Sequence, residues 1–238
     1  MNKRILILIK GIILLLAVSL LVSGCLNEKE DTQPDIVAGL KEALSIGTNN
    51  TVRQLNVLNG YYANPNPRYA AIKILLPQEA QAVESTLRSL PGMNSLVDTL
   101  ILQMNRAAED AASEAGPIFL DAIRNMTFED AMAILKGDSI AATTYMRRVT
   151  YNSLEALYTP KIKNSMEKVG AQQSWHQIAT AYNRIPFVTK LPTDISAYVT
   201  QKALDGLFFV LSKEEINIRR NPAARVTKLL RDVFKLQD

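Results

Sequence analysis

Nine polar residues in this 238-residue sequence lie within otherwise apolar or alanine-rich stretches. Their types could bind an anion or transfer a proton. Arginine presents a planar pair of donors that matches a carboxylate or phosphate, and a carboxylate can act as a general acid or base. The nine residues are Asn105, Arg106 and Glu109 in "MNRAAE", Arg147 and Arg148 in "YMRR", Asp205 in "KALDGLF", and Glu214, Glu215 and Arg219 in "KEEINIRR".

Three interpretations of these residues are open. One is local or interhelical pairing, which contributes only a few tenths of a kcal/mol at a helix surface. A second is a polar cleft in which several helices direct charges at an anionic or amphipathic ligand. A third is an acid/base pair of carboxylates, whose separation depends on the fold. The pairs with helical spacing are Arg106 with Asp110, Lys202 with Asp205, and Glu215 with Arg219.

Other catalytic chemistries find little support in the sequence. His176 is the only histidine, and no G-x-S-x-G motif accompanies it, so a serine hydrolase triad is not indicated. We expect Trp175 to pack inside and His176 to be exposed. The sequence has no calcium-loop pattern and no phosphate-binding glycine loop. We therefore expect no catalytic residue, no metal and no cofactor, although a carboxylate-dependent enzyme stays an alternative.

The only cysteine, Cys25, ends an N-terminal segment that has the features of a signal peptide. Lys3, Arg4 and Lys10 precede the apolar run "GIILLLAVSLLV". Two small residues, Ser23 and Gly24, end the segment. A retained transmembrane helix needs roughly 20 apolar residues, and residues 5–22 approach this only if Lys10 is tolerated. "LVSGC" resembles the lipobox of bacterial lipoproteins, which implies cleavage before Cys25 and acylation of its thiol and new N-terminus.

Lipidation of Cys25 would decide both the location and the redox chemistry of the chain. A diacylglycerol together with an amide-linked acyl chain supplies the two anchors that stable membrane attachment requires. No cysteine would then remain for a disulfide or a thiolate. Leu26 follows the cysteine where an aspartate favours inner-membrane retention in enterobacterial lipoproteins. The resemblance thus implies export to the periplasmic face of the outer membrane, given a Gram-negative source.

The charge balance argues against a nucleic-acid partner. The formal net charge is +4, with 27 basic and 23 acidic residues. Residues 1–24 hold three basic residues and no acidic one, so the mature chain has 24 basic and 23 acidic residues and a net charge of +1. Without a cationic excess, no nucleic-acid binding is expected. Residues 25–34 are polar and charged, which is typical of a solvated tether.

Helical periodicity extends over nearly all of residues 35–238, which predict one all-α domain of about eight to ten helices. The alanine-rich stretch 94–115 is expected to be a central packing element. Residues 59–76 hold two X-Pro bonds and predict the longest loop. Boundaries are expected at Gly47, at Thr159-Pro160, at a capping box of Ser212 with Glu215, and at caps formed by Thr127 and by Asn221-Pro222.

Five segments resemble the bacterial lipoprotein family of the domain of unknown function 4197. They are "GLKEALSIGT" (39–48), "MNRAAEDAA" (104–112), "FLDAIRNMTFEDAMAILKG" (119–137), "AATTYMRR" (141–148) and "YVTQKALDGLFFVLSKEEINIRRNPAARVTKLLRDVF" (198–234). The resemblance implies an all-helical, exported, lipid-anchored protein and supplies no activity. The sequence departs from the family pattern in the 59–76 region, where members carry a glycine-rich "GF" segment before a short I-x-L-P stretch.

Taken together, these patterns predict a membrane-anchored periplasmic lipoprotein that acts as a non-enzymatic binding or scaffold protein of the cell envelope. Its expected partners are the membrane, reached through the acyl chains on Cys25, and an envelope protein or a small anionic or amphipathic ligand. The alternative is an envelope hydrolase or transferase that uses the carboxylates and arginines among the nine residues.

Overall fold

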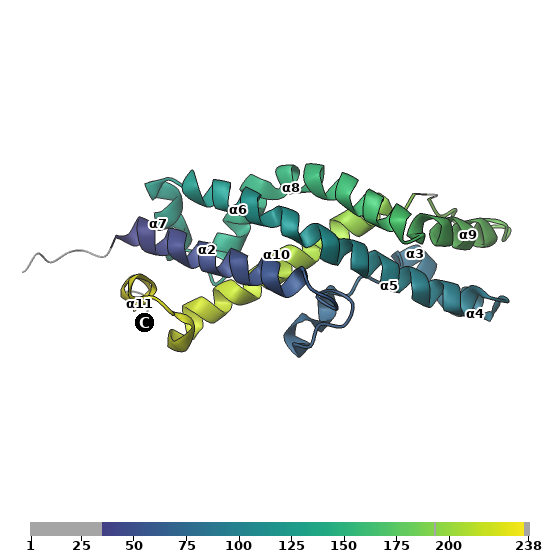
Figure 1. The fold of residues 1–238 in the computed structure, drawn as a ribbon, viewed down its shortest axis with the longest axis horizontal. Helices are drawn as coiled ribbons and strands as arrows, with labels where there is room; N and C mark the ends of the chain where they lie inside the picture. Colours follow the sequence, from purple (N-terminus) through teal and green to yellow (C-terminus); the bar gives the residue numbers. More distant parts are fainter. Residues whose placement is uncertain (1–34, 193, 236–238) are drawn as a thin grey trace, which may run out of the picture. The chain divides into compact units, whose positions relative to one another are not determined.

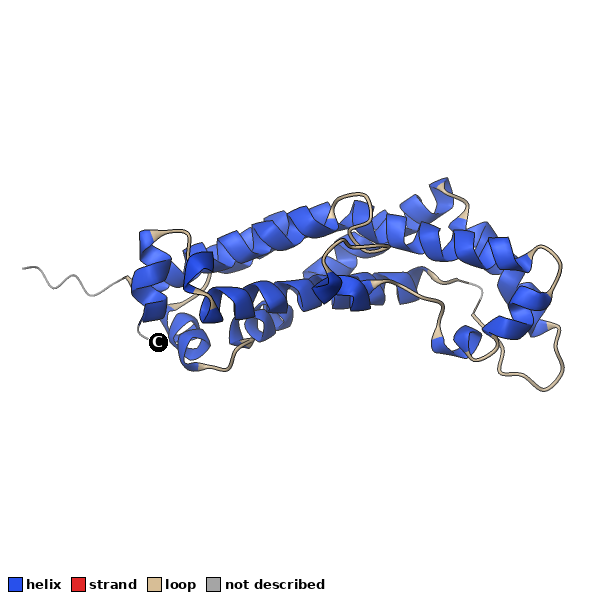
Figure 2. Ribbon diagram, turned by 90° about the horizontal axis from the view of Figure 1, so that it is seen from below, coloured by secondary structure: helices blue, strands red, loops and turns tan. Residues whose placement is uncertain are grey.

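Helices and their connecting loops make up the part of the chain that the computed structural model describes, residues 35–192 and 194–235 (Figure 1). No strand occurs in these ranges (Figure 2), which confirms the all-α fold class. The predictions for residues 1–24 and 25–34, Cys25 included, concern residues outside the described ranges. Among the described helices, none combines the length and apolar character needed to span a bilayer.

The described residues form ten α-helices and three short 3-10 turns, in agreement with the expected number of helices. The α-helices are α2 (Ile36–Leu55), α3 (Gln78–Gln81), α4 (Glu84–Ser89), α5 (Met93–Ala111), α6 (Ala115–Arg124), α7 (Phe128–Lys136), α8 (Ala141–Lys168), α9 (Ala171–Asn183), α10 (Ser196–Arg220) and α11 (Lys228–Phe234); the turns are η1 (Pro67–Ile72), η2 (Ala112–Glu114) and η3 (Pro222–Ala224).

Helix α10 organises the packing. It contacts α8, α2 and α5 and runs at an angle to α2 and α5 in Figure 1. Helix α5 also packs on α8 and α9, and α2 packs on α6, α7 and α11. One continuous hydrophobic core results, in which Trp175 is fully buried while His176 is exposed, as expected.

The alanine-rich stretch is buried, which confirms its expected role in packing. It extends through α5, η2 and the start of α6. Ala107, Ala108, Ala111, Ala112 and Ala115 are each at most 1% exposed. Small side chains let neighbouring helices approach closely, and α5 accordingly contacts α8, α9 and α10.

Three predicted helix ends are wrong because burial outweighs the local signal. Gly47 lies inside α2, next to Ile218 of α10, and the helix continues because Leu55 and other residues beyond it are buried. Pro160 is exposed within α8, where it removes one helical hydrogen bond. Ser212 lies inside α10, and its hydroxyl donates to the carbonyl of Phe209.

The predicted caps have mixed outcomes. Thr127 begins α7 with a capping box, in which its hydroxyl accepts from the N–H of Asp130 and its own N–H donates to the Asp130 carboxylate. Asn221 caps only η3 and not the terminal helix, which begins after Thr227. The chain turns between these two caps because Pro222 and the residues after it form a 3-10 turn.

Residues 56–77, here called the strap, connect α2 to α3 and contain the predicted 59–76 loop. The only regular element of the strap is η1. The strap packs closely against α10: a Cβ atom at Gly206 would lie 2.6 Å from Cε1 of Tyr61, so only glycine fits there. Apolar side chains along its length are buried, namely Tyr61, Tyr69, Ile72, Ile74 and Leu76.

Candidate functional site

The nine predicted residues do not meet in one cleft. The structure divides them into four places. The strap is held by Asn105, Arg106 and Glu109, and α2 is faced by Glu214. At the start of α8 lie Glu215 and Arg219 of α10. An open groove is bordered by Arg147, Arg148 and Asp205. Only the last of these places combines charge with open space.

Glu109 fixes the first part of the strap to α5. One carboxylate oxygen accepts hydrogen bonds from the backbone N–H groups of Tyr61 (3.0 Å) and Tyr62 (3.1 Å). The other oxygen pairs with Arg106 at 2.6 Å, and Arg106 also donates to the Asn59 side chain at 2.9 Å. Arg106 thus pairs with the residue three positions later, and not with Asp110 as its spacing allowed. The Glu109 carboxylate therefore accepts three hydrogen bonds from within the protein.

Asn105 fixes the last part of the strap in the same way. Its side-chain oxygen accepts from the N–H of Ile74 (2.8 Å), and its side-chain nitrogen donates to the carbonyl of Ile74 (2.8 Å). An asparagine can satisfy both backbone groups of one residue because its amide carries a donor and an acceptor side by side. Asn105 is completely buried, so its role is structural.

Glu214 joins α10 to α2 and to the strap through neutral donors. Its carboxylate accepts from Gln54 (3.0 Å), from the hydroxyl of Tyr69 (3.0 Å) and from Asn50 (3.3 Å). Within the described residues, no cation pairs with it. The side chain is buried, and its carboxylate accepts these three hydrogen bonds from within the protein.

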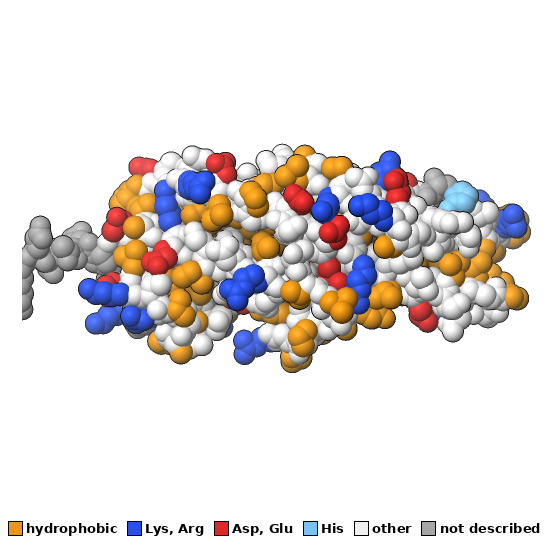
Figure 3. All heavy atoms as spheres, viewed as in Figure 1, with side chains coloured by type: hydrophobic (Ala, Val, Ile, Leu, Met, Phe, Trp, Pro, Cys, Tyr) orange, Lys and Arg blue, Asp and Glu red, His pale blue; other side chains and the backbone are white. Residues whose placement is uncertain are grey.

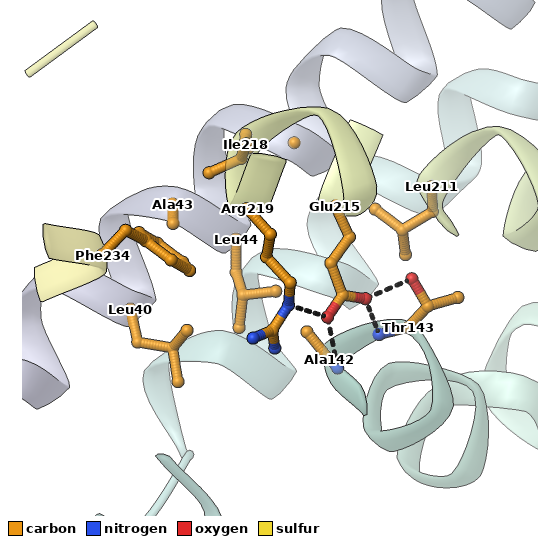
Figure 4. A pocket seen from close by; sticks show the side chains of 11 residues that line it. Leu40, Ala43, Leu44, Ala142, Thr143, Leu211, Glu215, Ile218, Arg219 and Phe234 are labelled. Carbon is orange, nitrogen blue, oxygen red and sulfur yellow. Dashed lines mark hydrogen bonds and ion pairs between the residues drawn. The ribbon is translucent and has the colours of Figure 1, made fainter. Parts of the chain in front are cut away.

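Glu215 and Arg219 form the buried ion pair of Figure 4, in which the carboxylate points at the first turn of α8. Glu215 accepts from the N–H groups of Ala142 (2.9 Å) and Thr143 (2.8 Å), and from Arg219 at 2.9 Å. The N–H groups of a first helical turn lack partners within the helix and favour a negative charge. Arg219 in turn donates to the carbonyl of Ile134 at the end of α7. The pair therefore joins α7, α8 and α10.

The cavity beside this pair is too small for a ligand. Figure 4 shows Leu40, Leu44 and Phe234 around it, and its volume is about 20 Å³, which is room for about one water molecule. The predicted pair of Glu215 with Arg219 is confirmed, but both side chains are only 8% exposed, so it is not a surface pair.

Arg147 and Asp205 pair across helices at the surface. Their side chains are 45% and 39% exposed, and the distance from Nη2 to Oδ1 is 2.8 Å. Asp205 therefore pairs with α8 and not with Lys202 on its own helix. The guanidinium of Arg147 lies over the ring of Phe208, 5.1 Å from its centre, which orients it by a cation–π interaction.

Two open concavities border α10 and meet at Asp205 and Phe209; together they are called the α10 groove. One, of about 310 Å³, lies between α10 and the strap and is also lined by Lys73 and Lys202. The other, of about 500 Å³, lies between α10 and α8 and is also lined by Arg147, Arg148, Ile140 and Phe208. These volumes are in the range of small-molecule sites.

A family model described as "Protein of unknown function (DUF4197)" matches residues 30–235. The chain belongs to the DUF4197 family. No curated protein and no solved structure matches the chain. The match confirms the resemblance found in the sequence, and the family description carries no activity that could be assigned to the groove.

Sequence reasoning missed part of the groove of this DUF4197 protein. Tyr198, Lys202 and Phe209 line it beside Asp205, whereas the spacing in the sequence indicates Lys202 only as a local partner of Asp205. A signal was present: Tyr198, Lys202, Asp205, Phe209 and Ser212 recur at steps of four and three along α10, which places them on one helical stripe. Lys73 had no such signal, because the strap has no helical period.

The raised pKa of Tyr69 in the strap predicts that the stability of the DUF4197 domain falls at alkaline pH. Burial and the neighbouring Glu214 carboxylate raise the pKa of Tyr69 from 10.0 to about 12. The unfolded chain therefore releases this proton first as the pH rises. The stability that the protonated phenol contributes is complete below pH 10 and is lost as the pH approaches 12.

We expect the urea midpoint to fall between pH 10 and pH 12, and the Tyr69→Phe substitution to make this fall less steep. The measurement is urea unfolding at a series of pH values, followed by circular dichroism. Tyr69→Phe also removes one donor to Glu214, which shifts all midpoints; the slope against pH is therefore the quantity compared. An identical slope in the variant would contradict the assignment to Tyr69.

Proposed function

We propose that the protein is a lipid-anchored, non-enzymatic binding protein of the cell envelope, which holds a small anionic and amphipathic molecule in the α10 groove. The observation that carries the proposal is the groove itself, where the exposed Arg147 lies on the Phe208 ring beside Arg148. Arginine donors suit a carboxylate or phosphate, and the aromatic and aliphatic walls suit a hydrocarbon part.

The state of the carboxylates favours binding over acid/base catalysis. Glu109, Glu214 and Glu215 each accept at least three hydrogen bonds or ion pairs and lie away from the groove. In the part of the chain that the structure describes, no three acidic, histidine or cysteine side chains are grouped so as to hold a metal ion. Asp205 is the only one of the four predicted carboxylates that lines the groove.

Location in the envelope is part of the same proposal, and the resemblance of "LVSGC" to a lipobox supports it. Acyl chains on Cys25 would anchor the protein, and residues 26–34 would connect the anchor to the helical domain. Basic and acidic side chains are interspersed on the face shown in Figure 3, and the mature charge is close to zero. Both features support a small ligand and not a polyanion as partner.

The binding proposal is tested by native mass spectrometry of the protein purified from membranes. We expect a small molecule bound to the wild-type chain and its loss from Arg147→Ala. A hydrogen bond to a charged group contributes about 1.5–3 kcal/mol, so affinity should fall by about tenfold or more. Arg53→Ala removes an exposed cation on α2 and should leave binding unchanged. A wild-type protein without a bound molecule, or equal loss from both variants, would contradict the proposal.

A further inference from the structure

In the ion pair at the centre of the α10 groove, each side chain uses only one of its polar atoms. Arg147 contacts Asp205 through one nitrogen and one oxygen. Within the described residues, neither charged group has another hydrogen bond or ion pair. Arg147 therefore presents unused donors, and Asp205 presents an unused acceptor, at neighbouring points of the same groove. No ion pair between Lys202 and Asp205 is present among the described residues; the Lys202 ammonium lies 5.8 Å from the centre of the Tyr198 ring.

This pattern of charges fits a ligand that carries both signs. A simple anion at Arg147 would lie beside the negative Asp205, which weakens its binding. A zwitterion could place its anionic group on Arg147 and its ammonium on Asp205, so that all four charges attract their neighbours. Exposed ion pairs are weak, so the Arg147–Asp205 contact can open slightly to admit such a ligand at little cost.

We propose that the α10 groove binds a zwitterionic amphiphile of the phosphoethanolamine type, with its phosphate at Arg147 and Arg148 and its ammonium at Asp205. The proposal rests on the binding function proposed above and names its ligand class. A phosphate is favoured over a carboxylate because two arginines line one concavity and a phosphate has enough oxygen atoms for both. Arg148 is 72% exposed and has only a long, 3.9 Å ion pair with Asp130, so its guanidinium can turn toward the phosphate. A hydrocarbon chain would cover Ile140 and Phe209 in the walls.

The test compares two probes that differ in the ammonium alone. O-Hexyl phosphoethanolamine carries it, and hexyl propyl phosphate replaces it by a methyl group. Isothermal titration calorimetry on the full-length protein in non-ionic detergent should show about tenfold tighter binding of the zwitterion. Partition of the probes into detergent is measured without protein and subtracted.

Asp205→Asn should remove this preference, because it weakens binding of the zwitterion and strengthens binding of the anion. The variant should fold, since exposed ion pairs contribute little to stability. Asp121→Asn removes an exposed carboxylate of α6 outside the groove and serves as the control for net charge. Tighter binding of the anion by the wild type, or an unchanged preference in Asp205→Asn, would overturn the zwitterion proposal. Binding that still depends on Arg147 would leave the binding function standing in that case.

A third probe separates a lipid from its soluble headgroup. If O-phosphoethanolamine, which has no hydrocarbon chain, binds as tightly as the hexyl compound, the ligand is not an amphiphile and that part of the proposal fails. Tighter binding of the hexyl compound supports a lipid. If none of the three probes binds and no molecule is retained from membranes, both the zwitterion proposal and the binding function fail.

Discussion

Replacing Glu215 with alanine is expected to lower the free energy of unfolding by about 3–5 kcal/mol, because it leaves Arg219 charged and buried without its carboxylate. The loss extends to α8, whose N–H groups at Ala142 and Thr143 would have no acceptor. Chemical denaturation followed by circular dichroism measures the effect. Breaking one partner of a buried ion pair is costly even where the intact pair contributes little.

Two further variants complete the test: one is a control at an exposed glutamate, and the other separates the charge of Glu215 from its hydrogen bonds. Glu167→Ala removes an exposed glutamate from α8 and should change stability by less than about 0.5 kcal/mol. Glu215→Gln keeps an acceptor but loses the charge, so it should fall between wild type and Glu215→Ala. If Glu215→Ala is no more destabilising than Glu167→Ala, the ion pair does not join α7, α8 and α10 as described.

Replacing Cys25 with serine is expected to abolish lipidation and to block removal of residues 1–24. If Cys25 is the acylated residue, its thiol is the only one in the chain that can carry the diacylglycerol. The variant should keep residues 1–24, run as the longer precursor on a gel and take up no alkyne-bearing fatty acid. Both acyl chains should be lost together, because the serine has no thiol for the diacylglycerol and an uncleaved chain has no free amine at residue 25 for the second acyl chain.

Ser23→Ala is the matched control, since it keeps a small residue beside the cleavage point. It should be processed and labelled like the wild type. Normal cleavage and labelling of the Cys25→Ser variant would show that the resemblance to a lipobox misleads.

The helical class and the core could be predicted because helical periodicity persists over most of the domain. The alanine-rich face of α5 follows directly from spacing, and the burial of Trp175 follows from its apolar side chain in an ordinary helical stretch. The helix ends were less predictable, since Gly47, Pro160 and Ser212 carry strong local signals that tertiary packing overrides. The cap at Thr127 was predictable because its hydrogen-bond partner, Asp130, lies only three residues later in the sequence.

The candidate site was only partly predictable, for a related reason. Charged residues in apolar helices are correctly singled out, but spacing along one helix cannot show which of them face another element. Glu109 and Asn105 turned out to bind strap backbone, and Asp205 to pair with Arg147 on a different helix. Such contacts depend on how the helices cross, which no local pattern contains.

The attachment of the strap also determines the order in which the chain can fold. Tyr61 donates to the carbonyl of Ala203, and Tyr69 donates to Glu214, residues 142 and 145 positions later in the chain. Contacts over such separations form slowly because a long loop must close first. The strap therefore reaches its final place only after α10 has been added. In a chain that emerges N-terminus first, Tyr61 and Tyr69 lack these two partners until α10 has been made, whereas Glu109 and Asn105 of α5 are already present to bind the strap backbone.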